Sequence, residues 1–323
     1  MKKILGIGNA LVDIMIRIDN DQILKDLELP KGSMQLVSKQ RSDQILEKLR
    51  DHERSFSAGG SVANTIHGLG MLGAKCGFTG VVGEDGIGGS FIRDMLNAGV
   101  DLHMIHSKNE TGSVVVLVSP DFERTFATHL GAAAEFIGDY LSALRFDAYD
   151  LVHIEGFLVQ DHNLVRTVAE KAREAGLMTS IDLASFNVVE ANREFLDEII
   201  SGYIDIVFAN DDEARALTGL EPRKALDRIA SMVRIAVVKT GNKGSLIKSG
   251  EKVHEIGIIP VKPVDTTGAG DLYASGFLYG LSRDLPLNTC GEYGALLAGN
   301  VIEVIGSKMS KEKWDKIRSA VAG

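Results

Sequence analysis

Apolar positions along the chain follow two alternating patterns: short continuous runs and longer segments with a helical period. The continuous runs predict buried strands over 3–7, 75–82, 151–154, 177–182, 204–209 and 235–239. The amphipathic segments predict helices over 21–27, 42–50, 163–175, 188–200, 211–218, 223–232, 271–281, 287–305 and 311–321, with two more ending near 72 and 97. Alternating strands and helices predict an α/β fold: a mostly parallel sheet with helices on both faces.

A second set of strands is half-polar and does not fit inside such a sheet. In 11–18, Ile14, Ile16 and Ile18 alternate with other side chains, which predicts a strand with one covered face. Segment 33–37 is a further strand, and the turn-rich 120–123 predicts a hairpin over 113–130. We interpret these segments as a small β-sheet lid inserted in a single domain, 1–323. A second hairpin is expected over 244–258.

The segment 265–271 (DTTGAGD) is the strongest candidate for chemistry. It precedes a predicted helix, so Gly268, Ala269 and Gly270 lie at a helix N-terminus, where unpaired N–H groups hold anions. Asp271 follows in the first turn. An anion cradle beside a carboxylate suits phosphoryl transfer, whereas a simple helix cap is the structural alternative.

Other polar and glycine residues stand at the predicted carboxyl ends of strands, where open α/β sheets bind ligands. They are Asn9, Asp13, Gly59, Gly60, Ser61, Asn64, Asn210, Glu213, Thr240 and Gly241. A single such residue is more often a cap or a turn residue, but together with 268–271 these residues make five groups at one sheet edge, which favours a site.

Composition and motifs exclude several classes. The net charge of −9 argues against a nucleic-acid surface, although it leaves room for a small anionic ligand. The two cysteines form no disulfide framework, and no apolar run predicts a signal peptide or a membrane span, so we expect a cytoplasmic protein. A dinucleotide fingerprint is rejected because Leu11 replaces its third glycine. There is no P-loop, zinc spacing or nucleophile elbow.

Two motifs together resemble the ribokinase-like (PfkB) family of carbohydrate and nucleoside kinases. Residues 58–64 (AGGSVAN) and 83–88 (GEDGIG) are similar to the first family signature, and 265–271 is similar to the second. The resemblance extends from about residue 3 to 306. It implies a three-layer α/β/α fold with a β lid, and ATP-dependent phosphorylation of a hydroxymethyl group.

The resemblance also implies roles for single residues. Asp271 is the general base, and the amides of Gly268, Ala269 and Gly270 form the anion hole. Segment 210–213 (NDDE) matches the motif in which Asn210 and Glu213 organise phosphate and Mg²⁺. The remaining residues assigned to the nucleotide are Thr240, Gly241, Gly244, Asp265 and Asn300.

The N-terminal half is most similar to adenosine kinases. On that resemblance Asn9 and Asp13 hold a ribose, Gln35 contacts the base, and Phe157 stacks on it. Gly59, Gly60, Ser61 and Asn64 complete the acceptor site, and Arg124 is a lid arginine that meets the transferred phosphate. Leu158 replaces a second aromatic residue, so a sugar kinase of the ribokinase or fructokinase type stays open. A non-catalytic ligand-binding relative is the alternative from another class.

The expected partner is therefore a small molecule, a nucleoside or a sugar, together with ATP and Mg²⁺. No nucleic-acid or membrane partner is expected. The half-polar strands fit either a monomer or a homodimer, because an exposed strand edge permits both.

Overall fold

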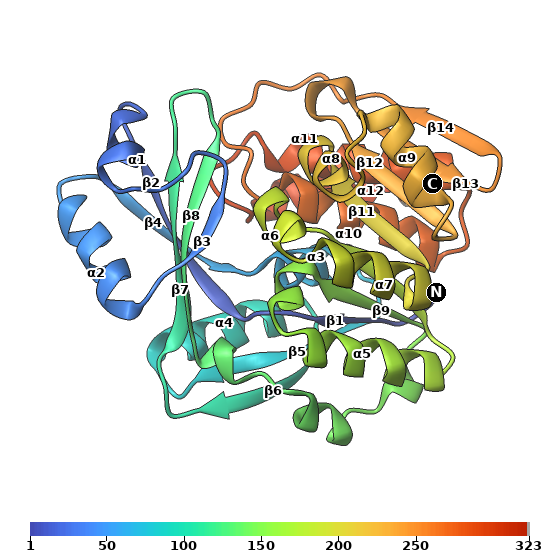
Figure 1. Cartoon of the computed structure of the whole chain (residues 1–323), viewed down its shortest axis with the longest axis horizontal. Coiled ribbons are helices and arrows are strands. Elements are labelled where there is room, and N and C mark those ends of the chain that lie inside the picture. The colour runs from blue at the N-terminus through green and yellow to red at the C-terminus, as the bar shows by residue number, and fades with distance from the viewer. Residues whose placement is uncertain (322–323) are drawn as a thin grey trace.

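A nine-stranded sheet forms the centre of the structure, a computed structural model that describes residues 1–321 (Figure 1). Its strand order is β14-β13-β12-β11-β10-β9-β1-β5-β6, and all pairs are parallel except those of β13. The strands are β1 (Ile4–Ile7), β5 (Cys76–Gly83), β6 (Asp101–Ser107), β9 (Leu151–Glu155), β10 (Met178–Asp182), β11 (Ile206–Asn210), β12 (Ile235–Lys239), β13 (Ser245–Ser249) and β14 (Lys252–Ile256). The prediction of a mostly parallel sheet is confirmed.

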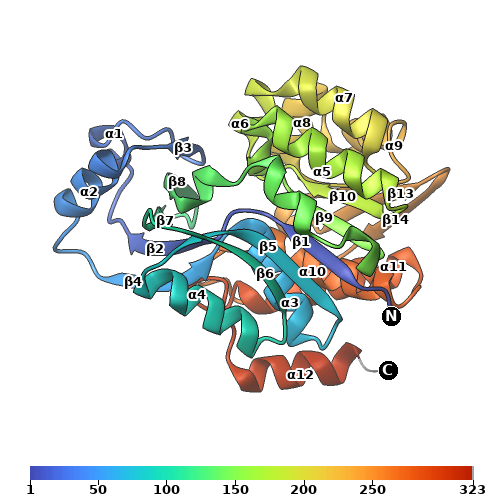
Figure 2. The same cartoon turned by 90° about the horizontal axis from the view of Figure 1, so that it is seen from below.

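Two layers of helices cover the sheet, one on each face (Figure 2). One layer contains α5 (His162–Glu174), α6 (Phe186–Ala191), α7 (Arg193–Tyr203), α8 (Asp211–Thr218) and α9 (Pro222–Ala230). The other contains α3 (Ser61–Met71), α4 (Gly86–Asn97), α10 (Ala269–Ser282), α11 (Leu287–Val301) and α12 (Lys311–Val321). Because the central strands are buried on both faces, each layer has its own apolar core.

A second sheet of five strands stands beside the first, in the order β3-β8-β7-β2-β4 (Figure 1). Its strands are β2 (Leu11–Arg17), β3 (Met34–Leu36), β4 (Arg54–Gly59), β7 (Thr111–Val118) and β8 (Arg124–Gly131). The hairpin predicted over 113–130 is present as the antiparallel pair β7–β8. The polar β4 is an additional edge strand that the apolar pattern did not predict.

The expectation that the strand over 11–18 has one covered face is wrong. Helices α1 (Gln22–Asp26) and α2 (Lys39–Lys48) pack on the outer face of the small sheet, where Ile16 and Leu117 are buried. Met15 and Val116 are buried on the inner face. The strand looked half-polar because it carries Asp13, which is buried in the site, and Arg17, which is exposed at the end of β2.

The chain crosses between the two sheets four times. Residues 8–10 connect β1 to β2, and Gly60 connects β4 to α3. Residues 108–110 connect β6 to β7, and β8 returns at Gly131, whose Cβ position lies 2.4 Å from the carbonyl oxygen of Glu110. The last two crossings therefore pack on each other.

Two further elements differ from the sequence-based expectation. The helix predicted over 188–200 is broken, because the Asn192 side chain donates to the carbonyl of Val188 at 2.9 Å and separates α6 from α7. Strand β6 was missed since its sequence, DLHMIHS, is polar at a partly exposed sheet edge. Short 3₁₀ helices occupy Ala132–Glu135, Gly138–Ala143, Phe146–Ala148, Gly156–Gln160 and Gly241–Lys243.

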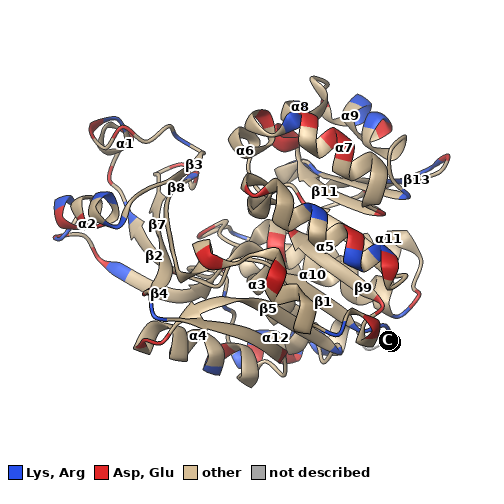
Figure 3. Ribbon diagram, turned by 60° about the horizontal axis from the view of Figure 1, so that its bottom comes forward, with Lys and Arg blue, Asp and Glu red and all other residues tan. Residues whose placement is uncertain are grey.

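Charged residues lie mainly on the outer helices. Figure 3 shows acidic and basic residues interspersed on α2, α5, α7 and α9. In the helices described over 1–321, none has both the length and the apolar character needed to span a bilayer.

Candidate active site

A cavity of about 1040 Å³ lies between the small sheet and the carboxyl ends of the central strands. This is the edge at which open α/β sheets bind ligands. Most of the residues singled out from the sequence line it: Asn9, Asp13, Gly60, Ser61, Asn64, Arg124, Phe157, Asn210, Glu213, Gly241, Gly244, Gly268, Ala269, Gly270 and Asp271.

The segment 266–270, here called the glycine loop, leads into α10 and is held in shape by Asp265. This carboxylate is fully buried. One oxygen accepts hydrogen bonds from the amide and hydroxyl of Thr267, at 2.9 and 2.7 Å, and the other accepts from the amide of Gly306 at 2.7 Å. Gly268 has φ +73°, which favours glycine. Asp265 thus shapes the loop from behind and does not line the cavity.

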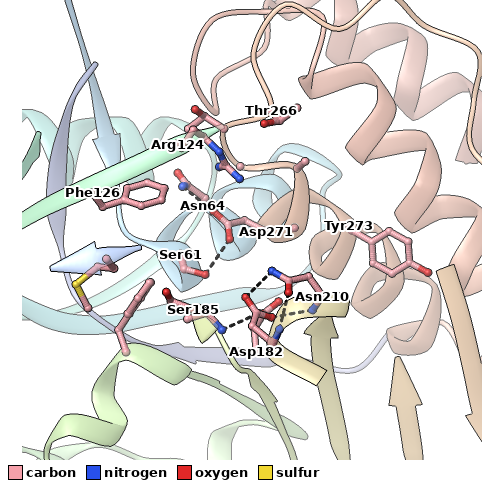
Figure 4. Close-up of a pocket in the computed structure, with 18 of the residues that line it drawn as sticks. Ser61, Asn64, Arg124, Phe126, Asp182, Ser185, Asn210, Thr266, Asp271 and Tyr273 are labelled. Atoms are coloured by element: carbon pink, nitrogen blue, oxygen red, sulfur yellow. Dashed lines mark hydrogen bonds between the residues drawn. The ribbon is translucent and has the colours of Figure 1, made fainter. Parts of the chain in front are cut away.

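Asp271 stands in the first turn of α10, held by the first turn of α3 (Figure 4). Its carboxylate accepts hydrogen bonds from the Ser61 hydroxyl at 2.8 Å and from Nδ2 of Asn64 at 2.9 Å. The Thr65 hydroxyl donates to the Asp271 carbonyl at 3.0 Å. Burial raises the pKa of Asp271 above its ordinary value, although the bond from Asn64 lowers it. The two signature motifs, 207 positions apart at these residues, therefore meet at one carboxylate.

Arg124 reaches over the site from β8 (Figure 4). Its guanidinium lies 5.6 Å from the ring centre of Phe126. Its Nε is buried and has no hydrogen-bond partner within residues 1–321. Because Arg124 lines the cavity, its guanidinium charge is suited to an anionic ligand there.

The polar end of the cavity near the crossings contains Asn9 and Asp13. Asn9 donates to Glu155 at 2.6 Å, and the same carboxylate accepts from the Val62 amide at 3.2 Å, which ties the start of α3 to β9. Burial, with the nearby Asp271 charge, raises the pKa of Asp13 to about 7. Gly59 does not line the cavity but makes room for Asp13, since a Cβ there would lie 2.4 Å from the Asp13 carboxyl.

Apolar side chains form the next part of the wall, towards the small sheet. They are Leu11, Met34, Leu36, Val114, Phe126, Leu130, Phe136, Phe157, Leu158 and Leu164. The predicted base contact Gln35 is not among the residues that line the cavity, because alternate residues of β3 face opposite ways and Gln35 donates to the Ser33 hydroxyl at 3.2 Å instead.

At the opposite end, the cavity lies between the loop 257–263 and α11. Asn210 and Glu213 form a reciprocal capping box on α8, with three hydrogen bonds of 2.7–2.8 Å. Burial raises the pKa of Glu213 to about 7. Two predicted residues do not line the cavity: Thr240, whose hydroxyl donates to the Gly244 carbonyl at 3.0 Å, and Asn300, which donates to Leu296 on its own helix. Ala295, Ala298 and Gly299 line it on α11.

The cavity contains no protein cage for a metal ion. Over 1–321, no three His, Cys, Asp or Glu side chains are grouped so that they could hold one. Both carboxylate oxygens of Glu213 accept hydrogen bonds from Asn210. These residues fit Mg²⁺ only in the way in which that ion usually binds in kinases, through substrate phosphates and water with few direct protein ligands.

Sequence reasoning missed Asp182 and Lys239, which line the cavity at the ends of β10 and β12. It also missed Glu155, although Glu155 stands two positions before the predicted base contact Phe157. Asp182 and Lys239 are 57 positions apart and belong to no motif used above. Their common position at the carboxyl ends of predicted parallel strands was the available signal.

Comparison with known proteins identifies the family. The profile of the pfkB family carbohydrate kinases matches residues 32–314. The chain is 31% identical to the adenosine kinase of Sinorhizobium meliloti, with a TM-score of 0.92 over 99% of both chains. It is 34% identical to a probable sugar kinase of Rhizobium etli, again with a TM-score of 0.92, over 99% of this chain and 98% of that one.

A curated relative agrees: the adenosine kinase of Schizophyllum commune is 25% identical, over 98% of each chain. A buried carboxylate beside a glycine loop is an arrangement that suits phosphoryl transfer to an alcohol. The chain belongs to the pfkB family of carbohydrate kinases and is an adenosine-kinase-like phosphotransferase with an alcohol group as acceptor.

Proposed function

We propose that the protein transfers the γ-phosphoryl group of ATP to the 5′-hydroxymethyl group of a nucleoside, with adenosine as the acceptor. The observation that carries the proposal is the division of the cavity next to Asp271. Asn9, Asp13 and Asn64 form a polar end that suits a ribose, and the apolar wall beyond it, which includes Phe126 and Phe157, suits a flat base. A free sugar would leave that apolar wall without a partner.

Asp271 would act as general base and accept the proton of the 5′-hydroxyl. Burial raises the pKa of its carboxyl above the ordinary value, which makes Asp271 a stronger proton acceptor when it is ionised. The amides of Gly268, Ala269 and Gly270 would form the anion hole at the N-terminus of α10. The Ala269 amide donates to the Thr266 carbonyl at 3.2 Å and would exchange that bond for one to the ligand. Arg124 would add a positive charge from the other side of the transferred group.

The adenine and phosphates of ATP would occupy the end of the cavity between α11 and the loop 257–263. Ala298 is small enough to admit a flat ring, while Ile259 of that loop packs against Gly299. Gly241 and Gly244 follow the end of β12. Mg²⁺ would be held by phosphate oxygens and water near Glu213, where it would neutralise phosphate charge.

The small sheet would be the lid, as its contacts with the larger part suggest. The Thr266 hydroxyl donates to the carbonyl of Phe122 at 3.2 Å, and Arg17 donates to the carbonyl of Val264 at 2.9 Å. Asn187 exchanges two hydrogen bonds with the backbone of Met34. A closed lid excludes water, which otherwise competes as phosphoryl acceptor.

The test is a coupled assay of ADP release with adenosine, inosine, cytidine, ribose and fructose as acceptors. We expect the highest kcat/KM with adenosine, and a product whose phosphate is on the 5′-oxygen. In Asp271→Asn, we expect kcat to fall about 10²–10⁴-fold with nucleotide affinity nearly unchanged. Asp85→Asn is the matched control, because Asp85 caps α4 through the Gly88 amide outside the cavity.

A higher kcat/KM with ribose or fructose than with every nucleoside would refute the nucleoside assignment and establish a sugar kinase. Near-normal turnover in Asp271→Asn would refute the assigned base. A wild-type protein that binds adenosine and ATP but transfers nothing would be the non-catalytic relative.

A further inference from the structure

A buried ion pair faces the cavity next to the glycine loop. Nζ of Lys239, at the end of β12, lies 2.7 Å from Oδ2 of Asp182, at the end of β10. Their side chains are only 13% and 7% exposed, and both line the cavity. The pair spans the end of β11, which lies between the two strands. Figure 4 shows Asp182 close to Asn210, near Asp271.

Stability alone does not account for a pair in this place. Removing two charges from water costs about as much as their attraction returns, so buried pairs are often replaceable by apolar residues. Another lysine of the same sheet, Lys248, forms an ion pair with Asp227 outside the cavity, and 54% of the Asp227 side chain is exposed. Lys239 therefore differs from Lys248 in where its charge is directed.

The ammonium group of Lys239 lies against the glycine loop. A Cβ built on Gly270 would be 3.0 Å from Nζ of Lys239, tighter than ordinary side-chain contacts. The absence of a side chain at position 270 thus lets the lysine charge stand beside the first turn of α10. That turn also carries the Gly270 amide and Asp271.

The lysine remains charged and has unused donors. Burial alone would lower the pKa of Lys239, but the carboxylates of Asp182, Glu213 and Asp271 outweigh burial and raise it above its ordinary value. An ammonium group has three N–H donors. Within residues 1–321, one of them is bonded, to Asp182. The other two are available to oxygen atoms of a ligand in the cavity.

We propose that Lys239 binds and neutralises the phosphoryl group that is being transferred at the glycine loop, and that Asp182 is the positioning residue that holds its ammonium group there. This inference rests on the proposed function of the site. In the step, the bond from the γ-phosphorus to the bridging oxygen breaks and ADP leaves with the electron pair. The acceptor oxygen forms the new bond, its proton passes to Asp271, and Lys239 exchanges no proton.

The Asp182 oxygens explain why the lysine stays in place. Oδ2 accepts from Lys239, while Oδ1 accepts from the amide of Ala184 at 3.2 Å, so the carboxylate is fixed at both ends. Without the Asp182 carboxylate, Lys239 keeps its charge, but its ammonium group is no longer held against the glycine loop. We therefore expect a smaller effect from Asp182→Asn than from Lys239→Met.

The experiment compares Lys239→Met, Lys239→Arg and Asp182→Asn with the control Lys248→Met. Calorimetry measures the affinity for the β,γ-imido analogue of ATP and for ADP. This binding measurement needs no acceptor. We expect Lys239→Met to weaken the analogue at least tenfold and ADP less than threefold, because only the analogue has a γ-phosphate. Turnover of adenosine should show kcat about 10²–10³-fold lower, with the KM for adenosine within threefold. Lys239→Arg should restore part of kcat, and Asp182→Asn should lose about tenfold.

The inference is overturned if Lys239→Met and Lys248→Met show the same ratio of affinities for the ATP analogue and for ADP, and the same kcat. If Lys239→Met does not fold, Asp182→Asn decides by the same two readouts, because it retains the lysine. If Asp271→Asn is inactive while Lys239→Met is active, the inference about Lys239 fails and the proposed function stands. If Asp271→Asn is active too, or if the wild type binds neither nucleotide, the proposed site fails together with the inference.

Discussion

Gly60→Ala tests how the crossing from β4 into α3 positions the carboxylate of Asp271, the proposed general base. Gly60 has φ +101°, a conformation that other residues rarely adopt, and a Cβ there would lie 2.2 Å from the carbonyl oxygen of Asn9. Real Cβ contacts are not shorter than about 3.0 Å, so one of the two backbones must move by about 0.8 Å. Backbone strain of this type costs about 1–3 kcal/mol.

The displacement acts on the bonds that hold Asp271. Ser61 follows Gly60 directly, and its bond to Asp271 is 2.8 Å long. A shift of about 0.8 Å is enough to break that bond, since hydrogen bonds between oxygens weaken steeply beyond about 3.0 Å. A misplacement of roughly 1 Å near the reacting groups costs about 10²-fold in rate. We expect Gly60→Ala to lower kcat by about that factor.

The matched control is Gly73→Ala, at the other end of the same helix. Gly73 has φ +80°, but a Cβ there would meet nothing within 4 Å. Both variants should show a reduced midpoint of thermal unfolding, while only Gly60→Ala should lose turnover in the ADP-release assay. Equal kcat in the two variants would refute the reasoning that α3 positions Asp271.

Two further predictions follow from groups at the two sides of the cavity. Asp13 has a pKa of about 7 in the folded protein against an ordinary value of 3.8, so the folded state binds more protons between these pH values. The free energy of unfolding should therefore fall as pH rises from about 4 to 7, and Asp13→Asn should make that fall less steep in urea titrations. An unchanged slope in the variant would contradict the buried carboxyl. Asn187→Ala removes both side-chain hydrogen bonds to the backbone of Met34. Amide hydrogen exchange in β3 should become faster, with β9 as an internal reference, and the KM for the acceptor should rise about three- to tenfold. Unchanged exchange in β3 would show that these bonds do not hold the small sheet.

The sequence predicted the central sheet well because its strands are buried on both faces. A run such as 204–209 is apolar at nearly every position, and β11 is found there, at Ile206–Asn210. Strands β4 and β6 escaped because an edge strand needs few apolar residues, so its composition resembles that of a loop. Register was equally out of reach: β3 has three residues, and one position decides whether Gln35 or Met34 faces the cavity.

The motif residues were predictable because each motif is local. The glycine loop with Asp271, and Ser61 with Asn64, stand within a few positions of one another. Lys239 and Asp182 were not predictable in this way, because their pairing depends on strand order and on a lysine that extends past β11. Asn300 shows the converse: its helix lines the cavity, but the side chain bonds to its own helix.

The four crossings between the sheets have a consequence for how the protein can vary. Asn9 and Gly60 belong to crossings and at the same time line the cavity where the acceptor is proposed to bind. If the small sheet moves as the proposed lid, a substitution there would change both its connection to the rest of the protein and the surface of the proposed acceptor site. Acceptor selectivity and the rate of lid opening would then change together at these positions, whereas β3 and the apolar wall could vary without altering the connection.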